Sequence, residues 1–131
     1  MLMMQFPLHD WKTKRIELWP PQDVKAHMDF LRRFNKELVD AGEFVRTEGL
    51  SGPEDTKVVH ASKDGTPTVT DGPFPESKEF LAGYWLVDVD SPQRAYEIAA
   101  RASAAPGPGS VPLFMPIQVQ RVMMHSTDGD V

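Results

Sequence analysis

Residues 71–84 read DGPFPESKEFLAGY and place a tight turn and a cluster of charged side chains directly before an apolar segment. Gly72-Pro73 bends the backbone and removes one N–H donor, so this stretch begins as a turn. From Leu81 to Val89 most side chains are apolar on both alternating faces, which predicts a central strand buried on both sides. Charge held at the edge of a core is a common setting for a functional site.

The composition is typical of a soluble globular protein, and we expect a single domain over residues 1–131. A chain of 131 residues is long enough for one hydrophobic core and too short for two. The net charge of -5 provides no basic excess to neutralise phosphates, so a nucleic-acid partner is not expected.

The cysteine count and the amino terminus predict where the protein works. There are no cysteines, which excludes disulfides and thiolate chemistry and fits a reducing compartment. The apolar residues 1–6 are too few for a signal peptide or a membrane span. We therefore expect a cytoplasmic protein with no membrane association.

Hydrophobic periodicity and turn residues predict the order of elements along the chain. A helix at residues 21–41 is expected to start at Pro21 and to end with Gly42 as a left-handed cap, and a second helix starts at Ser91-Pro92. Strands are expected at Met1–Leu8, Glu43–Glu48, Lys57–Ala61, Pro67–Thr70, Leu81–Val89 and Ile117–Met123, with a Pro/Gly-rich loop at residues 104–116 and a solvated connection at Lys12–Arg15.

This order predicts an α+β domain in which two helices cover one face of an antiparallel sheet, the ferredoxin-like arrangement. Such a sheet leaves its other face bare. Because the central strand is apolar on both faces, the bare face is expected to be buried by a second copy of the chain, which predicts a homodimer.

The turn stretch and several other positions closely resemble the YCII-related proteins of the DGPF type. The resemblance rests on Asp71-Gly72-Pro73-Phe74, Glu76, Lys78-Glu79 and Gly83-Tyr84, and it extends to Ala26-His27, Phe34-Asn35, Glu37-Leu38, Gly49-Leu50 and Ile117-Gln118-Val119. The sequence departs from the family pattern at two places in the last strand. Gln118 stands where an acid is usual, and at Gln120-Arg121 the arginine follows the polar residue, whereas in the family it precedes it.

The resemblance implies a dimeric α+β barrel of ferredoxin-like subunits, similar to muconolactone isomerase. Members of the wider family have been interpreted as enzymes with a His-Asp pair. Members of the DGPF type are often encoded beside, or fused to, extracytoplasmic-function sigma factors, which implies an association of that kind. The resemblance does not imply a particular reaction.

His27 and Asp71 are the candidate catalytic residues. On a helix, His27 shares the sheet-facing stripe with Leu31, Phe34 and Leu38, so its imidazole needs an interior partner. The alternative to a general base is a core histidine held by a backbone carbonyl. Asp71 can orient an imidazole from a turn at a strand end, or it can serve only to form its own turn.

The candidate substrate-binding residues are Asn35, Glu76, Lys78 and Tyr84. Asn35 either contacts a ligand or is a structural amide tying the helix to a strand. Glu76 and Lys78 either reach a cleft or form a solvated charge cluster. Tyr84 and Trp85 point to opposite faces of one strand, so one packs under the helices and the other faces a pocket or a partner subunit.

Two classes of function follow from these residues. The first is a cofactor-independent isomerase or lyase-like enzyme acting on a small molecule, with His27 as the base and Asp71 as its orienting partner in a cleft between the first helix and the turn stretch. The second is a non-catalytic dimeric module that binds a ligand or regulates a partner. No histidine stands at ligand spacing from nearby acids, so no metal site is expected.

Overall fold

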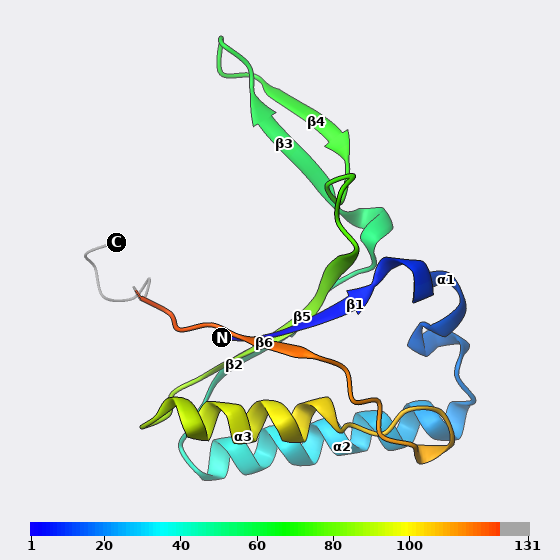
Figure 1. Cartoon of the computed structure of the whole chain (residues 1–131), viewed down its shortest axis with the longest axis vertical. Helices are drawn as coiled ribbons and strands as arrows, with labels where there is room; N and C mark the ends of the chain where they lie inside the picture. The colour runs from blue at the N-terminus through cyan, green and yellow to red at the C-terminus, as the bar shows by residue number, and fades with distance from the viewer. Residues whose placement is uncertain (124–131) are drawn as a thin grey trace.

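The computed structural model describes residues 1–123, and residues 124–131 of the expected domain lie outside this range. Figure 1 shows two long helices beneath a sheet and a hairpin that projects above it. The strands are β1 (Leu2–Pro7), β2 (Phe44–Gly49), β3 (Lys57–Ala61), β4 (Pro67–Asp71), β5 (Glu79–Val87) and β6 (Ile117–Val119), and the α-helices are α1 (Trp11–Lys14), α2 (Pro21–Asp40) and α3 (Pro92–Ser103).

The main sheet has four antiparallel strands in the order β2-β5-β1-β6, and β3 pairs with β4 as a separate hairpin. Strand β5 is central, as expected, because it pairs with β1 on one side and β2 on the other. In the register with β1, Trp85 lies opposite Leu2 and Tyr84 lies opposite Met3. The predicted α+β class with an antiparallel sheet is confirmed.

Helices α2 and α3 lie side by side along one face of this sheet (Figure 1). The predicted limits of α2 are confirmed to within a residue, with Pro21 in its first turn and Gly42 just past its end at φ 72°. Helix α3 begins at the predicted cap, where the Ser91 hydroxyl accepts a hydrogen bond from the Arg94 N–H. None of the helices within residues 1–123 is long and apolar enough to span a membrane.

The hydrophobic core lies between the helices and the sheet. Its fully buried side chains are Leu2, Phe34, Leu38 and Ile98. Phe34 of α2 meets Trp85 of β5 edge to face, with ring centroids 5.5 Å apart. Trp85 therefore faces the helices, and its neighbour Tyr84 faces the opposite side of the sheet, as the alternation along a strand predicts.

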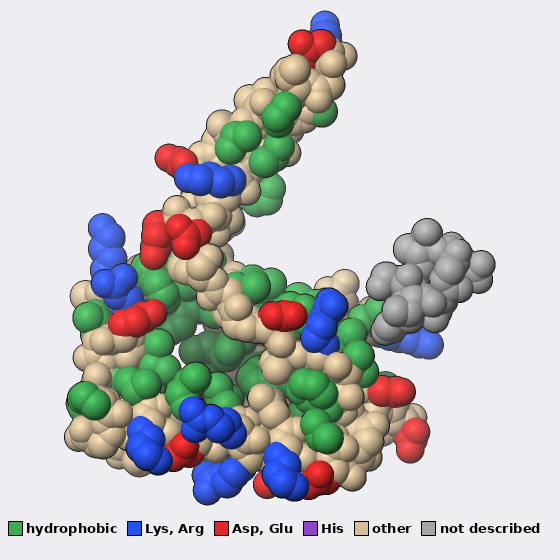
Figure 2. All heavy atoms as spheres, turned by 180° about the vertical axis from the view of Figure 1, so that it is seen from behind, with side chains coloured by type: hydrophobic (Ala, Val, Ile, Leu, Met, Phe, Trp, Pro, Cys, Tyr) green, Lys and Arg blue, Asp and Glu red, His purple; other side chains and the backbone are tan. Residues whose placement is uncertain are grey.

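We call the hairpin of residues 57–71 the arm, and the sheet face away from α2 and α3 the open face. The arm leaves the body on the open-face side (Figure 1). Its register pairs Lys57 with Asp71 and Val59 with Val69. Figure 2 shows hydrophobic side chains along the arm that no other part of the described chain covers.

Three elements differ from the sequence prediction. Strand β5 spans Glu79–Val87, two residues earlier at each end than the expected Leu81–Val89. Helix α1 replaces part of the expected solvated connection, because the Trp11 ring packs edge to face on Phe6 and Phe80 at 5.9 and 5.2 Å. Strand β6 is shorter than predicted, because within residues 1–123 it pairs with β1 alone and their register ends with Leu2 opposite Val119.

The Trp85 indole predicts a measurable role for Asn35 in stability. Asn35 Oδ1 accepts a hydrogen bond from Trp85 Nε1 at 2.8 Å, and Trp85 is 3% exposed. Asn35→Ala leaves this buried N–H without an acceptor, so we expect the free energy of unfolding to fall by about 2 kcal/mol in urea titrations. The control is Lys36→Ala, which loses only an exposed pair with Asp40 and is expected to cost much less stability. Equal losses from the two substitutions would contradict a structural role for the amide.

The ion pair between Glu43 and Arg94 predicts a pH dependence of stability. Arg94 donates Nε and an Nη to the two Glu43 oxygens at 2.8 Å, and these bonds lower the pKa of Glu43 below its ordinary value. A carboxyl with a lowered pKa stabilises the fold above its unfolded-state pKa and loses that contribution as the pH falls through its folded-state pKa.

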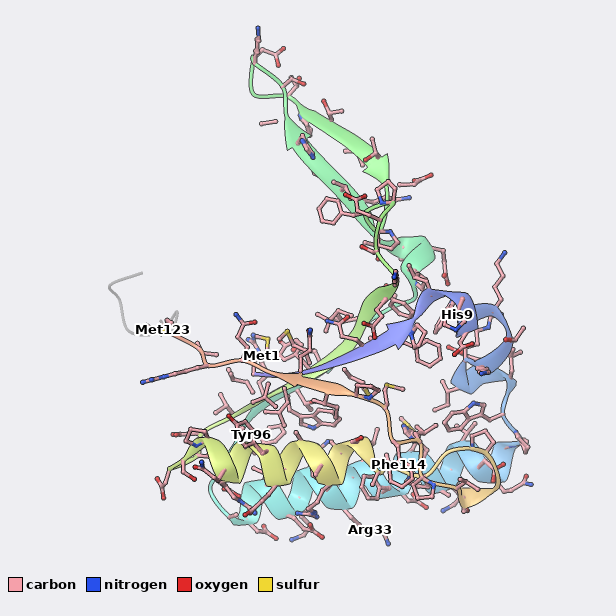
Figure 3. The ribbon with its side chains drawn as sticks, in the orientation of Figure 1. Met1, His9, Arg33, Tyr96, Phe114 and Met123 are labelled. Atoms are coloured by element: carbon pink, nitrogen blue, oxygen red, sulfur yellow. The ribbon has the colours of Figure 1, made fainter. Side chains whose placement is uncertain are left out.

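We therefore expect Arg94→Met to lower the free energy of unfolding at pH 7. The difference from the parent protein should close as the pH falls through the lowered pKa of Glu43, measured by urea unfolding at each pH. Arg33→Met is the control, since Arg33 lies on the outer side of α2 (Figure 3) and makes no side-chain hydrogen bond within residues 1–123. If Arg94→Met lowers the free energy of unfolding by the same amount at every pH, the ion pair with Glu43 is not the cause of the pH dependence.

Candidate functional site

His27 lies in the N-terminal half of α2 and is half-buried. Its Nδ1 lies 2.9 Å from the carbonyl oxygen of Pro106 in the Pro/Gly-rich loop. The Trp19 ring stands edge to face against the imidazole, with centroids 5.4 Å apart. The helix and the two flanking segments thus fix the orientation of the histidine ring on both sides.

The hydrogen bond to Pro106 also fixes which ring nitrogen carries the proton. A backbone carbonyl can only accept, so Nδ1 must donate, and the neutral imidazole keeps its lone pair on Nε2. Nε2 has no hydrogen-bond partner within residues 1–123. The imidazole as a whole is half-buried, between the buried and the exposed residues of α2.

The Pro/Gly-rich loop is attached to α2 at a second point. The Asp23 carboxylate, one helical turn before His27, accepts a hydrogen bond from the Gly109 N–H at 3.1 Å. Asp23 is 9% exposed, and Gly109 has a φ of 67°, which a glycine adopts without strain. Sequence reasoning missed Asp23, although its spacing of four residues from His27 places both side chains on one helix face.

Two attachments hold the loop over the N-terminal half of α2, beside His27. Figure 3 shows Phe114 in the part of the chain that passes over this helix before it turns back to β6. Within the loop, the Leu113 N–H donates to Ala105 O at 2.9 Å, which holds its two ends together. The expectation that this connection is irregular is confirmed, apart from a single 3-10 turn at Pro108–Ser110.

Asp71 lies at the base of the arm, where its carboxylate pairs with Lys57 Nζ at 2.7 Å. Its side chain is 92% exposed, and the hydrogen bond from Lys57 lowers the pKa of the carboxyl. The arm stands on the open-face side of the sheet, whereas α2 and His27 lie under the other face (Figure 1). Within one chain the structure therefore does not bring Asp71 and His27 together: His27 bonds to Pro106 and Asp71 to Lys57.

The candidate residues Asn35 and Tyr84 lie on opposite sides of β5. Asn35 is engaged by Trp85, which favours the structural alternative for its carbonyl oxygen. Tyr84 lies on the open face, with the Arg46 guanidinium 5.9 Å from its ring centroid. Nearby on the same face, Gln5 Nε2 donates to Gln118 Oε1 at 3.2 Å, so the position where an acid is usual still holds an acceptor.

Glu76 and Lys78 lie in the exposed connection from the arm to β5. The Lys78 carbonyl accepts a hydrogen bond from the Leu8 N–H at 2.9 Å, which joins this connection to the end of β1. Neither side chain makes a hydrogen bond or an ion pair with residues 1–123. Their role in binding a substrate stays a prediction.

Beside α2 the structure offers one group suited to proton transfer, the imidazole of His27. Figure 2 shows a hollow with hydrophobic side chains between the helix layer and the base of the arm. A histidine with a free Nε2 lone pair can accept a proton from a molecule bound beside it. In the part of the chain that the structure describes, no three His, Asp or Glu side chains gather in a way that could hold a metal ion.

The comparisons with known proteins give one finding. No curated protein matches this chain. A family model described as the YCII-related domain matches residues 11–111, a range that includes α2, the arm, β5, α3 and the turn of the Pro/Gly-rich loop. Because that range is well over half of the sequence, the chain belongs to the YCII-related domain family.

Proposed function

We propose that this YCII-related protein binds a small organic molecule beside the N-terminal half of α2 and that His27 Nε2 accepts a proton from it. The observation that carries the proposal is the 2.9 Å hydrogen bond between His27 Nδ1 and Pro106 O. It orients the ring and leaves Nε2 as the basic nitrogen. In the sequence-based hypothesis Asp71 had the orienting role, and in this chain the Pro106 carbonyl takes it.

The reaction that suits an oriented imidazole with a basic Nε2 is proton transfer at a carbon next to a carbonyl group. Nε2 takes the proton, and the electrons of the broken C–H bond move into the carbonyl to form an enolate. Return of the proton to a different carbon completes an isomerisation, and loss of a leaving group completes an elimination. Neither outcome needs a cofactor, which agrees with the isomerase or lyase-like activity expected from the sequence.

A second candidate function is a non-catalytic, homodimeric binding module, and the open face favours it. Tyr84 with Arg46 above its ring offers a planar apolar surface beside a fixed positive charge, and Gln5 with Gln118 adds amide groups. The strand order β2-β5-β1-β6 supports a ferredoxin-like subunit, whose open face closes into a dimeric barrel with a second copy. Membership of the DGPF type and association with a sigma factor stay predictions.

Two substitutions of His27 separate a proton acceptor from a packing residue. Asparagine places its amide N–H₂ close to the position of Nδ1, so His27→Asn keeps a donor for Pro106 O and removes the basic nitrogen, whereas His27→Ala removes both. The probes are small ketones, keto acids and lactones, with binding measured by thermal shift and proton transfer by deuterium exchange at the α-carbon in NMR spectra. We expect the parent protein to catalyse exchange and both variants to lose at least a hundredfold in exchange rate.

The stability of the two variants is the control. His27→Asn should unfold at nearly the temperature of the parent protein, while His27→Ala should unfold at a lower temperature because Pro106 loses its donor. If His27→Asn catalyses exchange as fast as the parent protein, His27 is not the proton acceptor. If the parent protein binds probes without exchange, and Tyr84→Ala but not His27→Asn weakens their binding, the binding module on the open face is the correct function.

A further inference from the structure

The arm has one apolar face, set by its register. Val59 pairs with Val69 and Ala61 pairs with Pro67, so these four side chains project from the same side of the hairpin. The same side carries the Lys57–Asp71 ion pair at the base of the arm, and the other side carries His60, Thr68 and Thr70 with Val58. Val59 and Val69 are 59% and 56% exposed. An alternating pattern with one apolar face is typical of a ribbon that is buried on that face.

Nothing within residues 1–123 covers this face. Strands β3 and β4 pair only with each other, and every residue of β4 is exposed. A two-stranded hairpin on its own is at best marginally stable in water. The arm thus needs a surface to pack against.

The same chain carries a second uncovered apolar surface on its open face. Tyr84 and Leu86 of β5 lie on this face and are only half-buried, and Met3 of β1 lies beside Tyr84. In the angle between the arm and the sheet, a groove of about 790 Å³ is lined by residues of both, including Val59 and Leu81. The arm and the open face of the sheet thus form the two sides of one groove.

We propose that the apolar face of each arm lies across the open face of a second copy of this chain, in a reciprocal two-fold arrangement. This inference rests on the homodimer proposed above and specifies which surfaces form it. Each chain presents one projecting arm and one open face, so a two-fold pair covers both surfaces with an identical interface on each copy. A different protein bound to either surface would leave the other uncovered.

Charge at the ends of the two surfaces agrees with this pairing. The tip of the arm carries Lys63 and Asp64, and the outer strand of the open face carries Arg46 and Glu48. Each charge at the tip therefore has a charge of opposite sign to meet on the second copy. The partner's arm would also cover Tyr84, so a ligand on the open face would be enclosed by residues from two chains.

Charge substitutions on the two faces of the arm test the proposal in solution. The double variant Val59→Lys with Val69→Lys places two charges in the interface at positions that are exposed in one chain, so its own fold should survive, as circular dichroism will check. Light scattering after gel filtration should give a dimer for the parent protein and a monomer for this variant, with the dissociation constant raised at least a hundredfold. The matched control, His60→Lys with Thr68→Lys, carries the same charges on the polar face and should remain a dimer.

Cross-linking identifies the surface that the arm contacts. Because the sequence contains no cysteine, single cysteines can be introduced without competing thiols. A mixture of Val69→Cys and Glu48→Cys chains should form a cross-linked mixed dimer with a short bifunctional maleimide. A control mixture of Thr68→Cys and Glu48→Cys chains should give a yield of mixed dimer that is at least fivefold lower.

Each contrary result has a distinct meaning. A monomeric parent protein overturns both the homodimer and the arm contact. A dimer that survives the two lysines, or Val69→Cys chains that cross-link to one another rather than to Glu48→Cys chains, overturns the arm contact alone. Neither result bears on proton transfer by His27, which is measured separately.

Discussion

The packing of Trp85 under α2 is the contact on which the rest of the arrangement depends. The indole ring packs edge to face against Phe34, and its N–H donates a hydrogen bond to Asn35. On the adjacent strand β1, the residue opposite Trp85 is the fully buried Leu2. A large aromatic side chain with one polar atom is stable in a core only when that atom has a partner. Asn35 therefore joins the long helix to the central strand at one register.

That register determines what each face of the sheet can do. With Trp85 directed to the helices, Tyr84 must lie on the open face, because adjacent residues of a strand alternate. The two functional hypotheses are separated in the same way. His27 lies under the helix-covered face with the loop that orients it, and the arm with Asp71 lies on the open-face side. A ligand on one side of the sheet cannot contact the candidate residues on the other within a single chain.

The sequence predicted the helices and strands better than it predicted which side chains lie close together in the folded chain. Helix α2, the β3–β4 hairpin and the cap at Ser91 follow from local rules that depend on residues near in the chain, and the structure has them close to their predicted limits. Within one chain His27 and Asp71 have other partners, Pro106 and Lys57, which the sequence could not indicate because a turn signal shows that the chain reverses, not to which side of the sheet the hairpin leads. Trp11 was missed for a related reason, since a single aromatic residue among lysines gives no periodic signal and reaches its partners only through tertiary packing.

The hydrogen bond between His27 Nδ1 and the Pro106 carbonyl can form whether the imidazole is neutral or charged. Nδ1 donates its proton to this oxygen when the ring is neutral, and it donates the same proton when Nε2 has also been protonated. Asp23 holds the loop at Gly109 independently of the histidine. A proton can therefore enter and leave the ring without releasing the loop, so the charge of the histidine can change while the position of the loop stays constant.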